Sequence, residues 1–278
     1  MRFKDFLAVK IPDAPRDLLP SRARIIDGVA LVRISEKVEP WVKDIGRYTI
    51  EYYPRVRAVY RWVRVEGVER RPIIEHIAGE RIRVVEHREY GWRLRLDIER
   101  LMLCLGNSYE RLRIARLISG NEIIVDMFAG VGQFTIPMAV IGKPAKIYSV
   151  EINPEAYHYL KENIILNKVQ HIVEPILGDC KKIVGEEIKD IADRVVMGYL
   201  GGTMEALPQA LKTLKSSGGM IHFHELARRG REEELVDILK EKVEELGYTL
   251  HIKGWNIVKS YSRTRNHIVI DFFSKAKA

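Results

Sequence analysis

From about residue 122 onward, short apolar runs alternate with stretches of helical periodicity, and this alternation constrains the fold more than any other feature of the chain. Such alternation is typical of strand–helix repeats that build a parallel sheet. Five strands are predicted, at Ile123–Met127, Lys146–Glu151, Ile172–Gly178, Arg194–Met197 and Met220–Glu225. Helices are expected to begin near Gln133, Pro154, Lys181, Thr203 and Gly230, with Asn153 as the N-cap before Pro154.

The chain closes with two more predicted strands, His251–Val258 and His267–Phe273, and the segment between them is too short for a helix. A strand entered through so short a connection must run antiparallel to its neighbour. Five strand–helix repeats followed by an antiparallel pair are similar to the class I S-adenosylmethionine-dependent transferases. The resemblance implies an α/β fold with a Rossmann-like sheet and a terminal antiparallel strand.

The first part of the chain has a different character, since it is rich in arginine and leans towards β-structure. Alternating stretches occur at Val56–Val65, Arg81–Glu86 and Trp92–Asp97, and the last two are expected to form a hairpin through Tyr90-Gly91. A length of 278 residues suggests about two domains. We therefore predict a smaller β-rich domain over residues 1–97 and a catalytic domain over residues 98–278.

Charge and aromatic content point to a polyanionic partner. The net charge is +8 and the isoelectric point is near 9.3, which favours nucleic acid. Between residues 47 and 71, tyrosines and Trp62 are interleaved with arginines, a pattern that can stack on bases and bind phosphates. A small β core with a solvated basic face would give the same pattern, so both interpretations remain open.

The cellular context is expected to be a reducing cytoplasm. Cys104 and Cys180 are far apart and form no CxxC motif, which disfavours a disulfide framework and a structural zinc site. Neither a signal peptide nor a membrane-spanning run is predicted. High charge and only three glutamines are typical of thermophilic proteins.

The turn after the first strand of the sheet is the predicted ligand loop. It runs from Asp126 to Thr135, and Gly130 and Gly132 let the backbone approach a ligand closely. The dinucleotide fingerprint requires a third glycine where this chain has Thr135, which disfavours a nicotinamide cofactor. Asp126 also disfavours a pyrophosphate, because two negative charges repel, and suits an ammonium group instead.

Two further acids follow the next strands. Glu151 lies 19 residues after Gly132, a spacing at which an acid binds a ribose diol, and Asp179 could accept from an adenine amino group. Any one strand-end acid can simply be exposed. Because three acids end three successive strands, the pattern predicts an adenosyl cofactor. The resemblance to the class I transferases implies that this cofactor is S-adenosylmethionine.

The loop after the fourth strand separates the possible reactions. It reads Gly198-Tyr199-Leu200 and offers no amide or proline to orient an amine or the N1 atom of guanine. Neither cysteine is followed by the proline that usually accompanies the nucleophile of pyrimidine C5 methylation. A plain glycine-rich turn that still supports methyl transfer remains the alternative.

Four segments resemble one archaeal family: Asn107–Arg113, Asp126–Gly132, Val150–Pro154 and Ser262–Asn266. That family comprises the tRNA guanine-N1 methyltransferase acting beside the anticodon and the wybutosine-synthesising tRNA aminocarboxypropyltransferase. The departure at Gly198-Tyr199-Leu200 favours the second. The resemblance then implies transfer of a 3-amino-3-carboxypropyl group to 4-demethylwyosine in tRNA(Phe), with methylthioadenosine released.

The same resemblance implies a set of site residues. The cofactor-binding residues are expected to be Ser108, Arg113, Asp126, Phe128, Gly130, Gly132, Glu151, Ile152, Asp179 and Cys180. Tyr199 and Arg111 are candidates for positioning the reactants, and an exposed helix surface is the alternative for the residues between 108 and 113. No catalytic acid or base is assigned.

Two other expectations complete the hypothesis. His222 and His224 are expected to be core and loop histidines, so no metal is predicted. The partner is expected to be the anticodon region of tRNA(Phe), bound through residues 47–71 and Ser262–Asn266 without a membrane, and a monomer is favoured. A guanine-N1 methyltransferase and an RNA-binding module with a vestigial cofactor pocket remain alternative functions.

Overall fold

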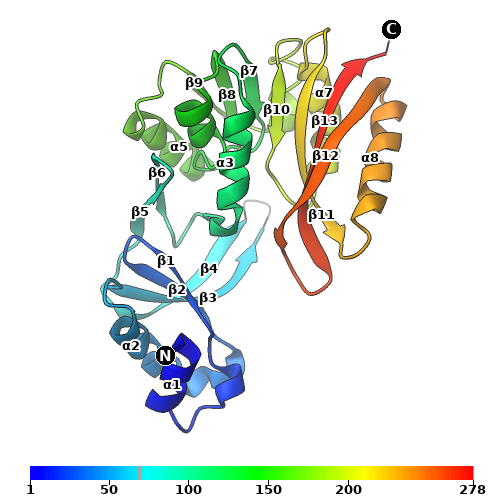
Figure 1. The fold of residues 1–278 in the computed structure, drawn as a ribbon. Helices are drawn as coiled ribbons and strands as arrows, with labels where there is room; N and C mark the ends of the chain where they lie inside the picture. Colours follow the sequence, from blue (N-terminus) through cyan, green and yellow to red (C-terminus); the bar gives the residue numbers. More distant parts are fainter. Residues whose placement is uncertain (68–69, 278) are drawn as a thin grey trace. The chain divides into compact units, whose positions relative to one another are not determined.

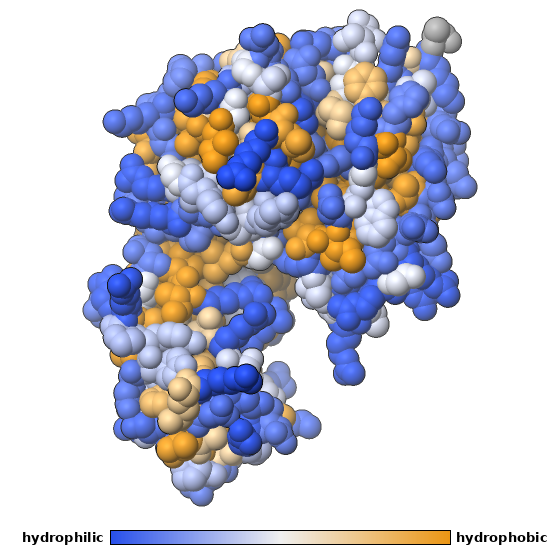
Figure 2. Space-filling model, in the orientation of Figure 1, coloured by the Kyte–Doolittle hydropathy of each residue, from blue (hydrophilic) through white to orange (hydrophobic). Residues whose placement is uncertain are grey.

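The computed structural model describes residues 1–67 and 70–277, which form two compact units (Figure 1). The first unit comprises Met1–His87 and Arg95–Leu103, and the second comprises Arg88–Leu94 and Cys104–Ala278. The boundary predicted at residue 97 stays a prediction, because the chain passes between the units more than once. Hydrophilic side chains cover most of the visible surface (Figure 2).

The first unit contains a four-stranded sheet in the order β1-β2-β3-β4. The strands are β1 (Ala23–Ile26), β2 (Val29–Arg33), β3 (Ala58–Glu66) and β4 (Arg71–Gly79). β1 and β2 form an antiparallel hairpin through Asp27 and Gly28, both with positive φ as a tight hairpin turn requires. β2 and β3 are parallel, whereas β3 and β4 are antiparallel.

Two helices, α1 (Phe3–Lys10) and α2 (Val42–Tyr52), complete this unit, and the sequence interpretation missed both. Their aromatic side chains pack on one another: Tyr52 lies 5.1 Å from both Phe3 and Phe6 between ring centroids. Tyr60 on β3 is fully buried. Part of the aromatic pattern predicted to stack on bases therefore belongs to the hydrophobic core, because aromatic residues serve both purposes.

The expected hairpin consists of β5 (Val84–Glu89) and β6 (Trp92–Asp97). Its turn is at Tyr90 and Gly91, whose φ angles are 42° and 94°. The first strand begins at Val84 rather than Arg81, so residues 81–83 lie outside it. The side chain of Trp92 is fully buried and is not available to a base.

The second unit contains a seven-stranded sheet in the order β12-β13-β11-β10-β7-β8-β9, which confirms the predicted α/β fold. Its strands are β7 (Ile123–Asp126), β8 (Lys146–Glu151), β9 (Val173–Leu177), β10 (Arg194–Met197), β11 (Gly219–Arg228), β12 (Tyr248–Ser260) and β13 (Arg265–Ala276). The neighbouring pairs β11–β10, β10–β7, β7–β8 and β8–β9 are all parallel. β13 lies between β11 and β12 and is antiparallel to both.

Helices connect the strands much as expected. They are α3 (Ser108–Leu117), α4 (Thr135–Pro137), α5 (Pro154–Leu166), α6 (Cys180–Ile183), α7 (Leu207–Thr213) and α8 (Glu232–Glu245). The predicted cap of α5 is present, since the Asn153 side chain accepts from the amides of Glu155 and Ala156. The helix expected near Lys181 is a single turn, and α4 continues as a π-helical segment over Met138–Gly142. Among the described residues, none of the helices is long and apolar enough to cross a membrane.

The core of this unit lies on the central strands. Val125, Val150, Val195, Ile221 and Ile270 each have no exposed surface, because strands covered on both faces must be apolar throughout. α5 packs on β8 and β9, and α8 packs on β11, β12 and β13. Strand order reverses between β7 and β10, and ligands of open α/β sheets bind in the crevice at the carboxyl ends of such strands.

Candidate cofactor site at the carboxyl edge of the sheet

The loop after β7 has a left-handed backbone at two positions, which favours glycine at both. The φ angles of Gly130 and Gly132 are 56° and 94°, in the left-handed region. A Cβ atom on Gly132 would lie 2.8 Å from Ile136 Cγ1 and 3.1 Å from Leu160 Cδ1. The loop therefore closes tightly over the following helix and leaves its backbone open to a ligand.

Asp126, the last residue of β7, is fully buried. Its carboxylate accepts hydrogen bonds from the Thr135 hydroxyl at 2.7 Å and from the Phe128 amide at 3.3 Å. Burial, partly offset by these bonds, raises the pKa of Asp126 to about 6. In this structure no part of the Asp126 side chain reaches the surface. The predicted contact of Asp126 with an ammonium group stays a prediction.

Glu151 holds two turns together at the end of β8. One carboxylate oxygen accepts from the Gly130 amide at 2.6 Å, and the other accepts from the Asn153 amide at 2.8 Å. Its predicted contact with a ribose diol stays a prediction. Ile152 beside it is 53% exposed and offers an apolar surface.

Asp179 and Cys180 follow β9 at the same edge. Asp179 is half-buried and accepts from the Lys181 amide at 2.9 Å, capping the single turn of α6. Burial raises the pKa of the Cys180 thiol to about 12, which excludes a thiolate nucleophile at neutral pH. The predicted contact of Cys180 with the cofactor stays a prediction.

The loops after β7 and β10 meet through two aromatic rings. Phe128 and Tyr199 are stacked, with centroids 5.2 Å apart and an interplanar angle of 22°. A Cβ atom on Gly198 would lie 2.8 Å from the ring of Phe134, so only glycine lets the second loop approach the first this closely. The structure thus brings the predicted positioning residue Tyr199 to the cofactor loop.

Glu225 on β11 fixes the loop that carries Tyr199, a role that the sequence interpretation missed. Its carboxylate accepts from the amides of Gly201 at 2.8 Å, Gly202 at 3.3 Å and Thr203 at 3.2 Å. No local pattern connects residue 225 with residues 201–203. The contact becomes visible only once β10 and β11 are known to be neighbours.

The predicted arm-binding residues on α3 have two different environments. Arg111 is fully buried; its guanidinium donates to Glu89 Oε2 at 2.7 and 3.0 Å and to the Cys104 carbonyl at 2.8 Å. The Ser108 hydroxyl also donates to Glu89. Glu89, which sequence reasoning did not single out, therefore anchors the start of α3. Arg111 contributes to this anchor through its hydrogen bonds to Glu89 and to the Cys104 carbonyl.

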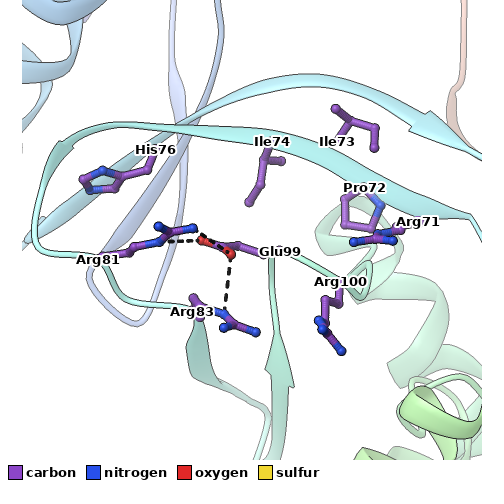
Figure 3. A pocket seen from close by; sticks show the side chains of 9 residues that line it. All are labelled: Arg71, Pro72, Ile73, Ile74, His76, Arg81, Arg83, Glu99 and Arg100. Atoms are coloured by element: carbon purple, nitrogen blue, oxygen red, sulfur yellow. Dashed lines mark hydrogen bonds and ion pairs between the residues drawn. The ribbon is translucent and has the colours of Figure 1, made fainter.

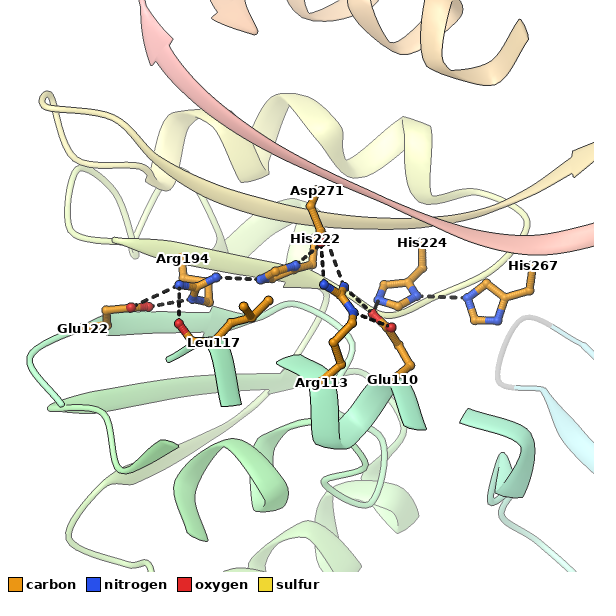
Figure 4. A network of polar contacts seen from close by, with 9 residues as sticks. All are labelled: Glu110, Arg113, Leu117, Glu122, Arg194, His222, His224, His267 and Asp271. Atoms are coloured by element: carbon orange, nitrogen blue, oxygen red, sulfur yellow. Dashed lines mark hydrogen bonds and ion pairs between the residues drawn. The ribbon is translucent and has the colours of Figure 1, made fainter. Parts of the chain in front are cut away.

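Arg113 belongs to a buried polar network instead (Figure 4). Its guanidinium donates to Glu110 at 2.8 Å and to Asp271 at 2.6 Å, and the hydrogen bonds to these carboxylates, which outweigh burial, raise its pKa above the usual range. His222 lies 2.6 Å from the same Asp271 and 2.7 Å from Arg194. The predicted contact of Arg113 with the cofactor's carboxylate stays a prediction, and in this structure two protein carboxylates take that place.

The two histidines that raised the question of a metal are both in the core. His222 belongs to the network just described, and His224 pairs with His267 at 2.9 Å. Burial lowers the pKa of His224 well below its usual range, so this ring is neutral. Within residues 1–67 and 70–277, no group of His, Cys, Asp and Glu side chains is arranged to hold a metal ion.

Two family models match the chain. The model described as the TRM5/TYW2 methyltransferase domain matches residues 85–251, and the model described as the TYW2 N-terminal domain matches residues 3–82. The first match alone covers more than half of the chain. The chain belongs to the TRM5/TYW2 family. The resemblance predicted from the local segments is confirmed.

The chain is similar both to relatives named as guanine-N1 methyltransferases and to relatives named as aminocarboxypropyltransferases. A Pyrococcus abyssi protein named tRNA (guanine(37)-N(1))-methyltransferase Trm5b is 35% identical over 95% of this chain and 78% of its own length. A Methanocaldococcus jannaschii protein named tRNA(Phe) (4-demethylwyosine(37)-C(7)) aminocarboxypropyltransferase is 40% identical over 74% of this chain and 81% of its own. The solved structure of Pyrococcus horikoshii TYW2 in complex with MeSAdo matches 99% of this chain and 100% of its own with a TM-score of 0.82 at 30% identity.

These matches test several expectations. The fold class and S-adenosylmethionine as the cofactor of the family are confirmed, since a second TYW2 structure is described as a complex with AdoMet. The transferase class is confirmed at the level of the family. The individual site residues stay predictions, and the structure places Phe128, Gly130, Glu151 and Tyr199 in one contiguous region while Arg113 lies in the buried network.

Proposed function

We propose that this TRM5/TYW2 family member transfers the 3-amino-3-carboxypropyl group of S-adenosylmethionine to 4-demethylwyosine, next to the anticodon of tRNA(Phe). The observation that carries the proposal is the loop after β10, where Tyr199 stacks on Phe128 and no amide or proline is present. An aromatic ring there can stack on a tricyclic base. The match of residues 3–82 to the TYW2 N-terminal domain supports the same choice.

The residues at the carboxyl edge fit the proposed cofactor. Gly130 and Gly132, both with positive φ, form the tight loop after β7, and Glu151 is proposed to accept from the hydroxyls of a ribose. Asp179 can accept from an adenine amino group, with Ile152 and Phe128 as apolar walls. Ser108 is proposed to reach the amino acid arm, while Arg111, Asp126 and Arg113 support the site from within the protein.

When bound, S-adenosylmethionine supplies a γ-carbon that the base attacks: a carbon–carbon bond forms, the sulfur–carbon bond breaks, methylthioadenosine leaves and the base loses a proton to solvent. The protein's own part is to orient the base on Tyr199 and to exclude other directions of attack. Alignment of two reactants can supply about 7–11 kcal/mol of a barrier, so positioning is expected to supply most of the acceleration. Glu225 holds the loop that performs this alignment.

Methyl transfer is the second candidate, favoured by the similarity to Trm5b over 95% of the chain. A Saccharolobus solfataricus protein named tRNA 4-demethylwyosine(37)-methyltransferase Taw21 is 32% identical over 90% of the chain. The acids and glycines described above would serve both reactions equally. The choice between them concerns only which carbon on the sulfur faces the base.

The reaction is tested with two cofactor preparations, one labelled in the aminocarboxypropyl carbons and one labelled in the methyl group. We expect label from the first to appear on tRNA(Phe) carrying 4-demethylwyosine, and methyl label to remain on methylthioadenosine. Methyl label on the tRNA, with adenosylhomocysteine released, would refute the proposal in favour of a methyltransferase. Unmodified tRNA with guanine at the same position is the matched control for the substrate.

We further propose that the tRNA is bound by arginines of residues 47–71 and by Ser262–Asn266, which comprise the end of the turn after β12 and the start of β13. Arg263 and Arg265 are exposed there, and the Ser262 hydroxyl accepts from the amides of Thr264 and Arg265, which fixes the turn. Arg263→Ala with Arg265→Ala is expected to make the salt dependence of tRNA binding shallower. Both cysteines are free, which supports the proposed location in a reducing cytoplasm. We also propose that the protein is a monomer and binds no metal.

A further inference from the structure

A pocket of about 340 Å³ lies within the first unit, away from the residues assigned so far except Arg71. Its walls come from β4 and from the segments before β5 and after β6 (Figure 3). The lining residues are Arg71, Pro72, Ile73, Ile74, His76, Arg81, Arg83, Glu99 and Arg100. Four of these nine side chains are arginines, which is an unusual concentration of like charge.

The positive charges of the lining outnumber the negative ones. Glu99 lies between Arg81 and Arg83, 3.3 and 3.4 Å from their guanidinium groups (Figure 3). Asp97, buried beside the pocket, accepts from Arg83 at 2.6 Å. Among the nine lining residues, four are arginines and one, Glu99, is acidic.

Two other acids of this unit pair with arginines outside the pocket. Glu80 is 3.2 Å from Arg57. Glu86 is 3.5 Å from Arg95. Like charges held together cost free energy unless an anion neutralises them, so the lining is suited to a negatively charged ligand.

The chemistry and shape of the walls narrow the class of anion. Guanidinium groups bind phosphate oxygens in pairs of parallel hydrogen bonds, and the cations among the lining residues are arginines rather than lysines. Ile73 and Ile74 both contribute to the wall, where a register shift between Trp62 and Arg64 interrupts the pairing of β3 and β4. An apolar wall beside clustered arginines fits a phosphate that carries an organic group.

We propose that this pocket binds a backbone phosphate of RNA, with the attached ribose against Ile74. The inference rests on the proposed function, because it takes tRNA as the substrate. Glu99 then has a positioning role, since its carboxylate holds Arg81 and Arg83 in the lining. A free phosphate or a mononucleotide shares this chemistry, and the experiment separates these sources.

The test compares two double variants with the same loss of charge. Arg71→Gln with Arg81→Gln alters the pocket. Arg16→Gln with Arg22→Gln is the control, because these exposed arginines lie in the same unit outside the pocket, and Arg16 resembles Arg81 in exposure and in pairing with one acid. The affinity for tRNA is measured over a series of salt concentrations for each protein.

We expect the pocket variant to flatten the slope of log affinity against log salt by about 0.7–0.9 for each phosphate that it no longer binds, and the control to leave the slope unchanged. Arg81→Lys, which keeps the charge, should retain most of the slope. Equal slopes in the pocket variant and the control would overturn the proposal. If the double variant unfolds, the exposed Arg81→Gln alone is measured in its place.

Inorganic phosphate distinguishes the alternative source. Phosphate that raises the melting temperature of the unaltered protein but not of the pocket variant, together with equal tRNA slopes, would mean that the pocket takes a small anion and not RNA. The same preparations are assayed for label transfer. Transfer with an unaffected slope overturns only the pocket, whereas a salt-dependent complex with no aminocarboxypropyl transfer overturns only the proposed function.

Discussion

Replacing Asp126 by asparagine should stabilise this protein at neutral pH. The carboxylate has no exposed surface, and burial raises its pKa from 3.8 to about 6. A group whose pKa is raised by folding favours the folded state at low pH, and this contribution is lost as the pH rises through the folded pKa. Two pKa units at about 1.4 kcal/mol each make ionised Asp126 destabilising by about 3 kcal/mol above pH 6.

The geometry around Asp126 explains why asparagine is tolerated. The Thr135 hydroxyl lies 2.7 Å from the Asp126 carboxylate and 2.9 Å from the Ser149 hydroxyl, and either hydroxyl can be the donor between those two. The side-chain amide of the substituted asparagine can therefore donate to Thr135 while Thr135 donates to Ser149. This arrangement resembles that of the protonated acid, so the variant and the unaltered protein should have equal stability below about pH 4.

The assay is urea unfolding of both full-length proteins at intervals between pH 4 and pH 8. We expect the difference in unfolding free energy to grow across the window from about pH 4 to pH 6 and then to level at about 3 kcal/mol. Thr135→Val removes a hydrogen bond that lowers the pKa, so it should shift the upper end of the window to higher pH. A difference that does not change with pH would refute the reasoning.

Cofactor affinity gives this variant a second readout. We expect Asp126→Asn to keep the affinity for S-adenosylmethionine within about threefold, which corresponds to less than about 1 kcal/mol. Loss of a direct charged hydrogen bond would cost about 1.5–3 kcal/mol, or roughly ten- to a hundredfold. A loss of that size would show that Asp126 contacts the cofactor's ammonium group after all.

Three further predictions concern acids of the second unit. Glu151→Ala should weaken S-adenosylmethionine binding by several-fold to about a hundredfold in calorimetric titration, because a charged acceptor and the tie to the glycine loop are removed; unchanged affinity would exclude Glu151 from the site. Glu225→Ala should lower kcat/KM for tRNA by about ten- to a hundredfold without altering cofactor affinity, whereas Glu205→Ala, an exposed acid of the next turn, should change neither; equal effects of the two changes would contradict the role of Glu225. Asp271→Asn should cost about 3–5 kcal/mol of unfolding free energy at pH 7, and because the hydrogen bonds from His222 and Arg113 outweigh burial and hold the pKa of Asp271 far below its usual range, the cost should shrink only below about pH 4; a cost that stays constant down to pH 2 would speak against the ion pairs.

The sheet of the second unit could be predicted because its strands are short apolar runs separated by helices of recognisable periodicity. β8 and β10 occur with the predicted bounds. The helices of the first unit could not be predicted, because α2 carries tyrosines whose residue type suits a strand, a core or a base-stacking surface equally. Only the packing on α1 decides among these environments.

The candidate site was predictable where its residues are local to a turn. The acids and glycines stand at strand ends, and their positions follow from the parallel topology. Glu89 and Glu225 were missed because each acts on a segment about 20 residues away in sequence. The pairing of Arg113 with Asp271 could not be predicted, because the two residues are 158 positions apart in sequence.

The place of β13 within the sheet bears on how the domain is made. β13 pairs with both β11 and β12, yet it is synthesised after both. Until it emerges from the ribosome, β11 has an open edge, and Arg113 and His222 lack the carboxylate of Asp271. Until β13 is complete, the nascent domain therefore has an unpaired strand edge beside a polar network that lacks one of its carboxylates, and the insertion of that single strand completes both.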